Sequence, residues 1–153
     1  MFKKILVAVD GSPTSNKGYK VAVELAKSVG AKLVVLHVID ERAVGIGLSA
    51  SGFVAPAYVE DVIAALRDAG RKVLAKAQRE AQAKGQAIDA HLVESLGNGV
   101  AYTILAQAKK QKADLVVLGT HGRRGLARVV VGSDAETVLR EAAVPVLLVR
   151  AKS

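Results

Sequence analysis

The chain has 153 residues, of which 51% are apolar and only 3% aromatic, as expected for a single domain with an aliphatic core. It contains no cysteine, which excludes disulfides, thiolate metal sites and a cysteine nucleophile. The net charge of +8 favours anionic partners. The densest cluster of basic residues in the chain is confined to one predicted loop and contains Arg123, Arg124 and Arg128. A small phosphorylated ligand fits this local cluster better than nucleic acid, which binds extended basic faces.

Strand and helix patterns alternate along the whole sequence. Short runs of Val, Leu and Ile are typical of buried parallel strands, and longer segments with apolar residues at helical spacing predict helices. The predicted strands cover residues 5–9, 32–39, 87–96, 115–118 and 146–149, and the predicted helices cover 15–29, 58–84, 100–111 and 134–143. This alternation predicts a mainly parallel α/β sheet with right-handed crossovers. We expect one domain, residues 1–153.

One stretch, residues 43–57, carries no charge and is rich in Gly, Ala and Ser. We predict a loop there. Two interpretations stay open: a flap over a ligand, or a packing surface that includes an oligomer contact.

The carboxyl ends of the predicted strands carry the informative residues. Open parallel sheets bind ligands beyond these ends, at the point where the strand order reverses. Asp10 follows the first strand, Val38 lies near the end of the second, and Gly119 follows the fourth. If the sheet is doubly wound, these three positions lie along one edge.

The strongest signal is Gly119-Thr120-His121-Gly122, followed after nine residues by Gly132-Ser133. Glycines let a backbone approach phosphate closely, and consecutive N–H groups form an anion-binding nest. The Gly132-Ser133 pair also begins a predicted helix, whose N-terminus attracts phosphate. His121 and Arg123 lie in the same loop.

Structural alternatives exist for several of these residues. Ser133 and Glu136 match a capping box, in which Ser133 only caps the helix, and the neighbouring Asp134 would repel phosphate. Asp10 can contact a ribose or form an Asx-type turn. No Walker loop, Rossmann fingerprint or nucleophile elbow is present in the sequence. We therefore predict no catalytic residues, no metal ligands and no turnover enzyme.

The loop has the spacing Gly119-x2-Gly122-x9-Gly132-Ser133, which resembles the nucleotide-binding signature of ATP-binding universal stress proteins. Three further segments resemble the same family, in the family's order: residues 4–12 (KILVAVDGS), 36–40 (LHVID) and 144–149 (VPVLLV). The resemblance covers residues 2–151. It implies a Rossmann-like three-layer α/β/α sandwich with a five-stranded parallel sheet, of the adenine-nucleotide alpha-hydrolase-like type.

The resemblance also implies roles for individual residues. Asp10 would contact the adenosine and Val38 would line the adenine pocket. Gly119 and Gly122 would shape the loop around ribose and phosphates. Gly132 and Ser133 would hold phosphate, and His121 and Arg123 would contact it. The implied ligand is ATP with Mg²⁺, and the implied assembly is a homodimer through the closing strand, an exposed apolar edge.

The leading hypothesis is an ATP-dependent sensor or switch of the stress response that acts on an unidentified protein partner. The alternatives are slow ATP hydrolysis or autophosphorylation and, below these, nucleic-acid binding that rests on charge alone. The sequence has no apolar run of about 18 residues and no signal-peptide pattern at Met1–Ile5. We expect a cytoplasmic protein without a membrane span.

Overall fold

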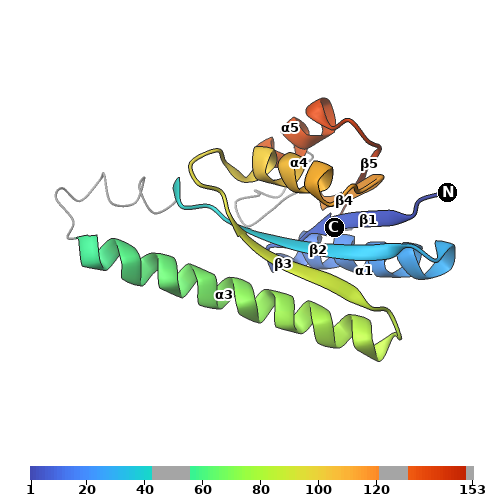
Figure 1. Ribbon diagram of the computed structural model, residues 1–153, viewed down its shortest axis with the longest axis horizontal. Helices are drawn as coiled ribbons and strands as arrows, with labels where there is room; N and C mark the ends of the chain where they lie inside the picture. Colours follow the sequence, from blue (N-terminus) through green and yellow to red (C-terminus); the bar gives the residue numbers. More distant parts are fainter. Residues whose placement is uncertain (43–55, 121–130, 151–153) are drawn as a thin grey trace.

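The computed structural model describes residues 1–42, 56–120 and 131–150. Strands and helices alternate through these residues (Figure 1). The elements are β1 (Lys4–Ala8), α1 (Pro13–Val29), β2 (Lys32–Ile39), α3 (Pro56–Ala83), β3 (Ile88–Glu94), α4 (Val100–Lys110), β4 (Leu115–Gly119), α5 (Ser133–Glu141) and β5 (Val146–Val149).

The strands form one sheet in the order β3-β2-β1-β4-β5, and every neighbouring pair is parallel. Helices α1 and α3 cover one face, and α4 and α5 cover the other (Figure 1). The predicted three-layer α/β/α sandwich with a five-stranded parallel sheet is confirmed.

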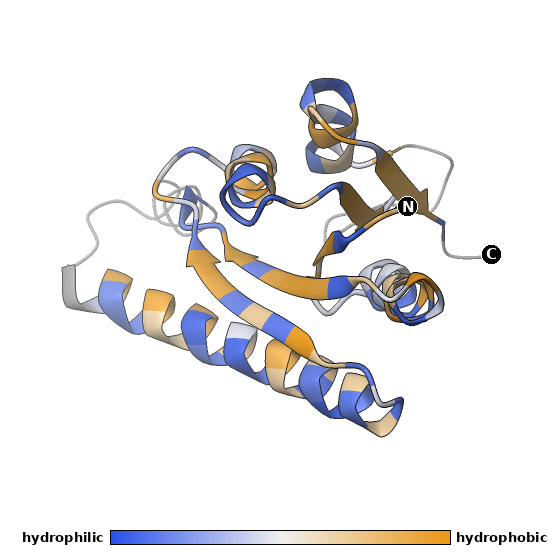
Figure 2. Cartoon of the chain, turned by 45° about the vertical axis from the view of Figure 1, so that its right-hand side comes forward, coloured by the Kyte–Doolittle hydropathy of each residue, from blue (hydrophilic) through white to orange (hydrophobic). Residues whose placement is uncertain are grey.

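The core divides into two apolar layers because strand side chains alternate between the faces of the sheet. In β1, Ile5 and Val7 pack against α1 and α3, whereas Leu6 packs against α4 and α5. All three side chains are fully buried. Helix α3, which packs on one of these layers, carries hydrophobic stripes between hydrophilic ones (Figure 2), as expected for a helix with one face on a sheet.

Several predicted boundaries agree with the structure and others move. Strands 32–39 and 146–149 have the predicted limits, and Gly30 ends α1 with a left-handed φ of 66°. Helix α1 begins at Pro13, two residues earlier than predicted, because Ser12 caps it. Helix α3 begins at Pro56, inside the segment predicted as a loop. Residues 43–55 of that segment lie outside the described residues.

In the described part of the chain, no helix combines the length and the apolar character that crossing a membrane requires.

Candidate functional site

The strand order reverses between β1 and β4. From β1 the chain proceeds outward to β2 and β3, and it then returns to the other side of β1 to form β4 and β5. In open parallel sheets a crevice forms at such a point, beyond the carboxyl ends of the two strands. Asp10 follows β1 and Gly119 ends β4, so both lie at the predicted ligand edge.

The turn after β1 is fixed by three hydrogen bonds. The Asp10 carboxylate accepts a bond of 2.9 Å from the Ser12 backbone N–H. The Ser15 hydroxyl accepts one of 2.9 Å from the Asp10 N–H, and the Ser12 hydroxyl accepts one of 3.2 Å from the Ser15 N–H. The Asx-type turn is confirmed, and it holds Asp10 in a defined position at the sheet edge. A contact between Asp10 and a ribose stays a prediction.

Gly119 has a packing role that needs no ligand. A Cβ on Gly119 would lie 2.9 Å from the backbone N of Ser15 and 2.9 Å from the carbonyl carbon of Thr14. Helix α1 therefore begins in direct contact with the end of β4, and the first turn of α1 occupies the space of a side chain. The predicted contribution of Gly119 to a ligand loop is untested.

The N-terminus of α5 is attached to the end of β4. The Gly132 N–H donates to the Thr120 carbonyl at 2.7 Å, and the Thr120 N–H donates to the Val149 carbonyl at 3.0 Å. Gly132 is the N-cap and makes no side-chain capping hydrogen bond. The capping-box alternative for Ser133 is therefore wrong: Ser133 is the first residue of the helix, and it is exposed.

Asp134 faces a different helix from the one it belongs to. Its carboxylate accepts a hydrogen bond of 3.3 Å from the backbone N–H of Ala101, in the first turn of α4. Gly99, the N-cap of α4, supplies no side chain, so Asp134 takes the place of a cap. The Asp134 carboxylate thus has a structural role at α4, and its negative charge lies one residue from Ser133.

Five of the eight predicted site residues can be placed. Asp10, Gly119, Gly132 and Ser133 lie at or beyond the ends of β1 and β4. Val38 lies near the end of the neighbouring strand β2, half-buried on the α4 and α5 face of the sheet. The other three, His121, Gly122 and Arg123, lie outside the described residues.

An ion cluster at the ends of β2 and β3 was not predicted. Arg67 on α3 donates from Nε to Glu94 at 2.5 Å and from Nη1 to Glu60 at 3.0 Å. The hydrogen bond from Arg67 lowers the pKa of Glu94. Burial raises the pKa of Glu41, and its hydrogen bond to Glu94 raises it further. Among the described residues, no group of acidic or histidine side chains is arranged to hold a metal.

Two further features that position the site were not predicted. Ser12 followed by Pro13 is a recognisable helix start, since serine is a preferred N-cap and proline a preferred first residue. That signal predicts the α1 boundary and the capping hydroxyl. The bonds of Thr120 to Gly132 and Val149 involve only backbone groups, and such bonds have no sequence signal.

Comparison with known proteins gives consistent matches. The model of a family described as the universal stress protein family matches residues 1–150. The universal stress protein YxiE of Bacillus subtilis is 35% identical over 151 residues, which cover 98% of this chain and 100% of that protein.

Solved structures agree with this result. The crystal structure of a universal stress protein family member from Burkholderia pseudomallei is 35% identical, with a TM-score of 0.76 and coverage of 97% of this chain and 96% of that one. A universal stress protein in complex with cAMP is 25% identical, with a TM-score of 0.69 and coverage of 99% of each chain.

Proposed function

The chain belongs to the universal stress protein family, and on that premise we propose that it binds ATP with Mg²⁺ beyond the carboxyl ends of β1 and β4, a place called the β1–β4 edge below. In this proposal the nucleotide makes the protein a sensor or switch of the stress response, whose state a partner protein reads.

The convergence of two features at one sheet edge supports this proposal most. One is the fixed turn at Asp10, and the other is the N-terminus of α5, attached to the end of β4. A helix N-terminus presents unpaired N–H groups and the positive end of the helix dipole, both of which favour phosphate. An exposed Ser133 in the first turn adds a hydroxyl.

The proposed roles follow from these positions. Asp10 and Val38 contact the nucleoside, and Gly132 and Ser133 hold phosphate at the start of α5. His121, Gly122 and Arg123, from the segment between β4 and α5, complete the proposed phosphate contacts. The complex of a 25% identical universal stress protein with cAMP supports an adenine nucleotide as the ligand class.

Thermal unfolding of nucleotide-free protein, with and without Mg-ATP, tests the proposal. Ligand at about 100 times its Kd stabilises a native state by roughly 2.7 kcal/mol. For a chain of this size we expect a rise in Tm of about 5–10 °C. Gly122→Val is expected to remove the rise, and cAMP and ADP measured in parallel rank the nucleotides. No rise at millimolar Mg-ATP contradicts the proposal.

We propose that the protein binds ATP without hydrolysing it efficiently. ADP production by the purified protein, followed over time, separates this proposal from slow hydrolysis or autophosphorylation at Ser133. ATP-dependent ADP formation that Asp10→Ala abolishes favours the enzymatic alternative.

Hydrogen exchange with and without ATP tests the switch. If ATP leaves hydrogen exchange in residues 43–57 and 119–132 unchanged, the switch proposal is wrong.

The proposed assembly is a homodimer through β5. This strand lies at one end of the sheet, and such an edge presents unpaired backbone groups to a second chain. Sedimentation equilibrium is expected to give twice the chain mass. A monomer at every concentration contradicts the proposed dimer.

A further inference from the structure

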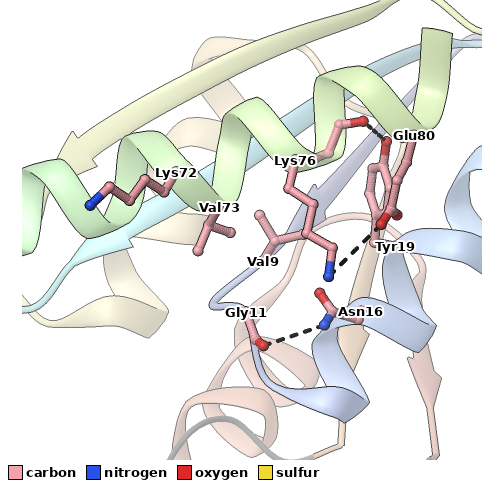
Figure 3. A pocket seen from close by; sticks show the side chains of 9 residues that line it. Val9, Gly11, Asn16, Tyr19, Lys72, Val73, Lys76 and Glu80 are labelled. Carbon is pink, nitrogen blue, oxygen red and sulfur yellow. Dashed lines mark hydrogen bonds and ion pairs between the residues drawn. The ribbon is translucent and has the colours of Figure 1, made fainter.

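A cavity of about 250 Å³ lies between α1 and α3, on the face of the sheet opposite to Val38 (Figure 3). Its wall includes Gly11 but none of the five predicted site residues that the structure describes. Gly11 has a φ of +82°, and a Cβ there would lie 3.2 Å from Cγ2 of Val73 on α3. Among the described residues, the cavity therefore shares no lining residue with the proposed nucleotide site, although both adjoin the turn after β1.

The floor of the cavity is apolar and uncharged. Val9, Tyr19 and Ala77 line it and are each at most 5% exposed. The Tyr19 hydroxyl donates a hydrogen bond to the Ala77 carbonyl. Burial, and after it the charge of Glu80, raises the pKa of Tyr19 to about 12, so the side chain is neutral near neutral pH. A ligand here meets hydrocarbon and an aromatic ring.

The rim is polar and carries two lysines, each of which lies beside a carboxylate of α3. Lys72, Lys76 and Glu80 come from α3, and Asn16 comes from α1. Figure 3 shows Lys76 reaching from α3 toward Asn16. The Lys76 ammonium lies 3.9 Å from the Glu80 carboxylate, and Lys72 lies 3.2 Å from Asp68. Exposed ion pairs of this kind contribute little, so an incoming anion can compete for the lysines.

We propose that this cavity is a second ligand site, which binds a small aliphatic monocarboxylate. The hydrocarbon chain would pack on Val9, Val73 and Tyr19, and the carboxylate would meet Lys76 at the rim. Pockets for drug-sized ligands begin at about 300 Å³, so this cavity takes a smaller molecule. An apolar floor with polar groups at the rim, as found here, is the usual composition of a small-molecule site.

Titration of the nucleotide-free full chain with sodium hexanoate tests the site, at constant ionic strength. The signals to follow by NMR are the Asn16 side-chain amide and the methyl groups of Val9 and Val73. We expect saturable shifts at these groups with a Kd on the order of 1 mM for a ligand of this size. Hexanol and hexylamine are expected to bind more weakly than hexanoate.

Two variants separate the rim charge from the net charge of the protein. Lys76→Gln is expected to weaken hexanoate roughly twofold to fivefold, the effect of one exposed ion pair. Lys110→Gln makes the same change on α4, at an exposed position on the other face of the sheet, and is expected to leave the Kd unchanged. Both substitutions are at the surface and preserve the core.

Three results would overturn the proposal. The first is the absence of saturable shifts at the cavity groups, or their presence only at Asp10 and Ser133. The second is hexylamine or hexanol binding as tightly as hexanoate. The third is an equal effect of Lys76→Gln and Lys110→Gln, which would indicate attraction by overall charge.

Discussion

Gly119→Ala tests whether the end of β4 needs glycine for packing. The added Cβ would lie 2.9 Å from two backbone atoms of α1, in Ser15 and Thr14, and 3.0 Å from Cγ2 of Thr14. Backbone cannot move aside as a flexible side chain can, so α1 must shift away from the strand. Overpacking of this kind costs up to about 3 kcal/mol, which lowers the Tm of a chain of this size by about 6–12 °C.

Urea unfolding of nucleotide-free protein measures this cost without a contribution from ligand. The control is Gly85→Ala. Gly85 has a φ of +69°, and a Cβ there would meet no atom within 4 Å, so its substitution costs only the left-handed strain of about 1 kcal/mol. If Gly119→Ala is no more destabilising than Gly85→Ala, the close contact between α1 and β4 does not constrain this position.

Three further predictions concern stability. Asp134→Ala is expected to lower the free energy of unfolding by about 1 kcal/mol, as the loss of a helix cap does, and to speed hydrogen exchange at the Ala101 amide. The control Glu136→Ala is expected to do neither. The raised pKa of Tyr19 contributes stability that is complete below the usual value of 10.0 and disappears as the pH rises through about 12; urea unfolding across this range should show a smaller loss in Tyr19→Phe. Burial acts to raise the pKa of Asp114, but hydrogen bonds from the backbone N–H groups of residues 3 and 4 together outweigh it and lower the pKa below its usual 3.8. This contribution is present above 3.8 and disappears as the pH falls through the lowered value, so Asp114→Asn should unfold with a shallower acid dependence than the parent chain.

The fold could be predicted from sequence because its signals are local. Apolar runs of β-branched residues and helical periodicity indicate the strands and helices, and their alternation restricts the sheet to parallel pairing. The predicted ends of helices and strands were less accurate where a side-chain hydrogen bond determines the end. Helix α1 starts at Pro13 because the Ser12 hydroxyl accepts from Ser15 N–H.

The candidate site was only partly predictable. The order of the predicted strands placed Asp10, Val38 and Gly119 at one edge, because the carboxyl ends of parallel strands share an edge of the sheet. Spacing did not distinguish a ligand role for Gly119 from its contact with α1, which depends on a packing distance between residues about 100 positions apart. For the same reason the sequence could not show that Asp134 bonds to α4.

The most direct test of nucleotide binding at the β1–β4 edge is an NMR titration of the nucleotide-free chain with Mg-ATP. The proposed site predicts that the backbone amide signals of Asp10, Val38 and Ser133 shift together and give one Kd, while the signal of the Asn16 side-chain amide in the α1–α3 cavity does not shift. Saturable binding that shifts the cavity groups and leaves the amides of Asp10 and Ser133 unchanged would contradict it.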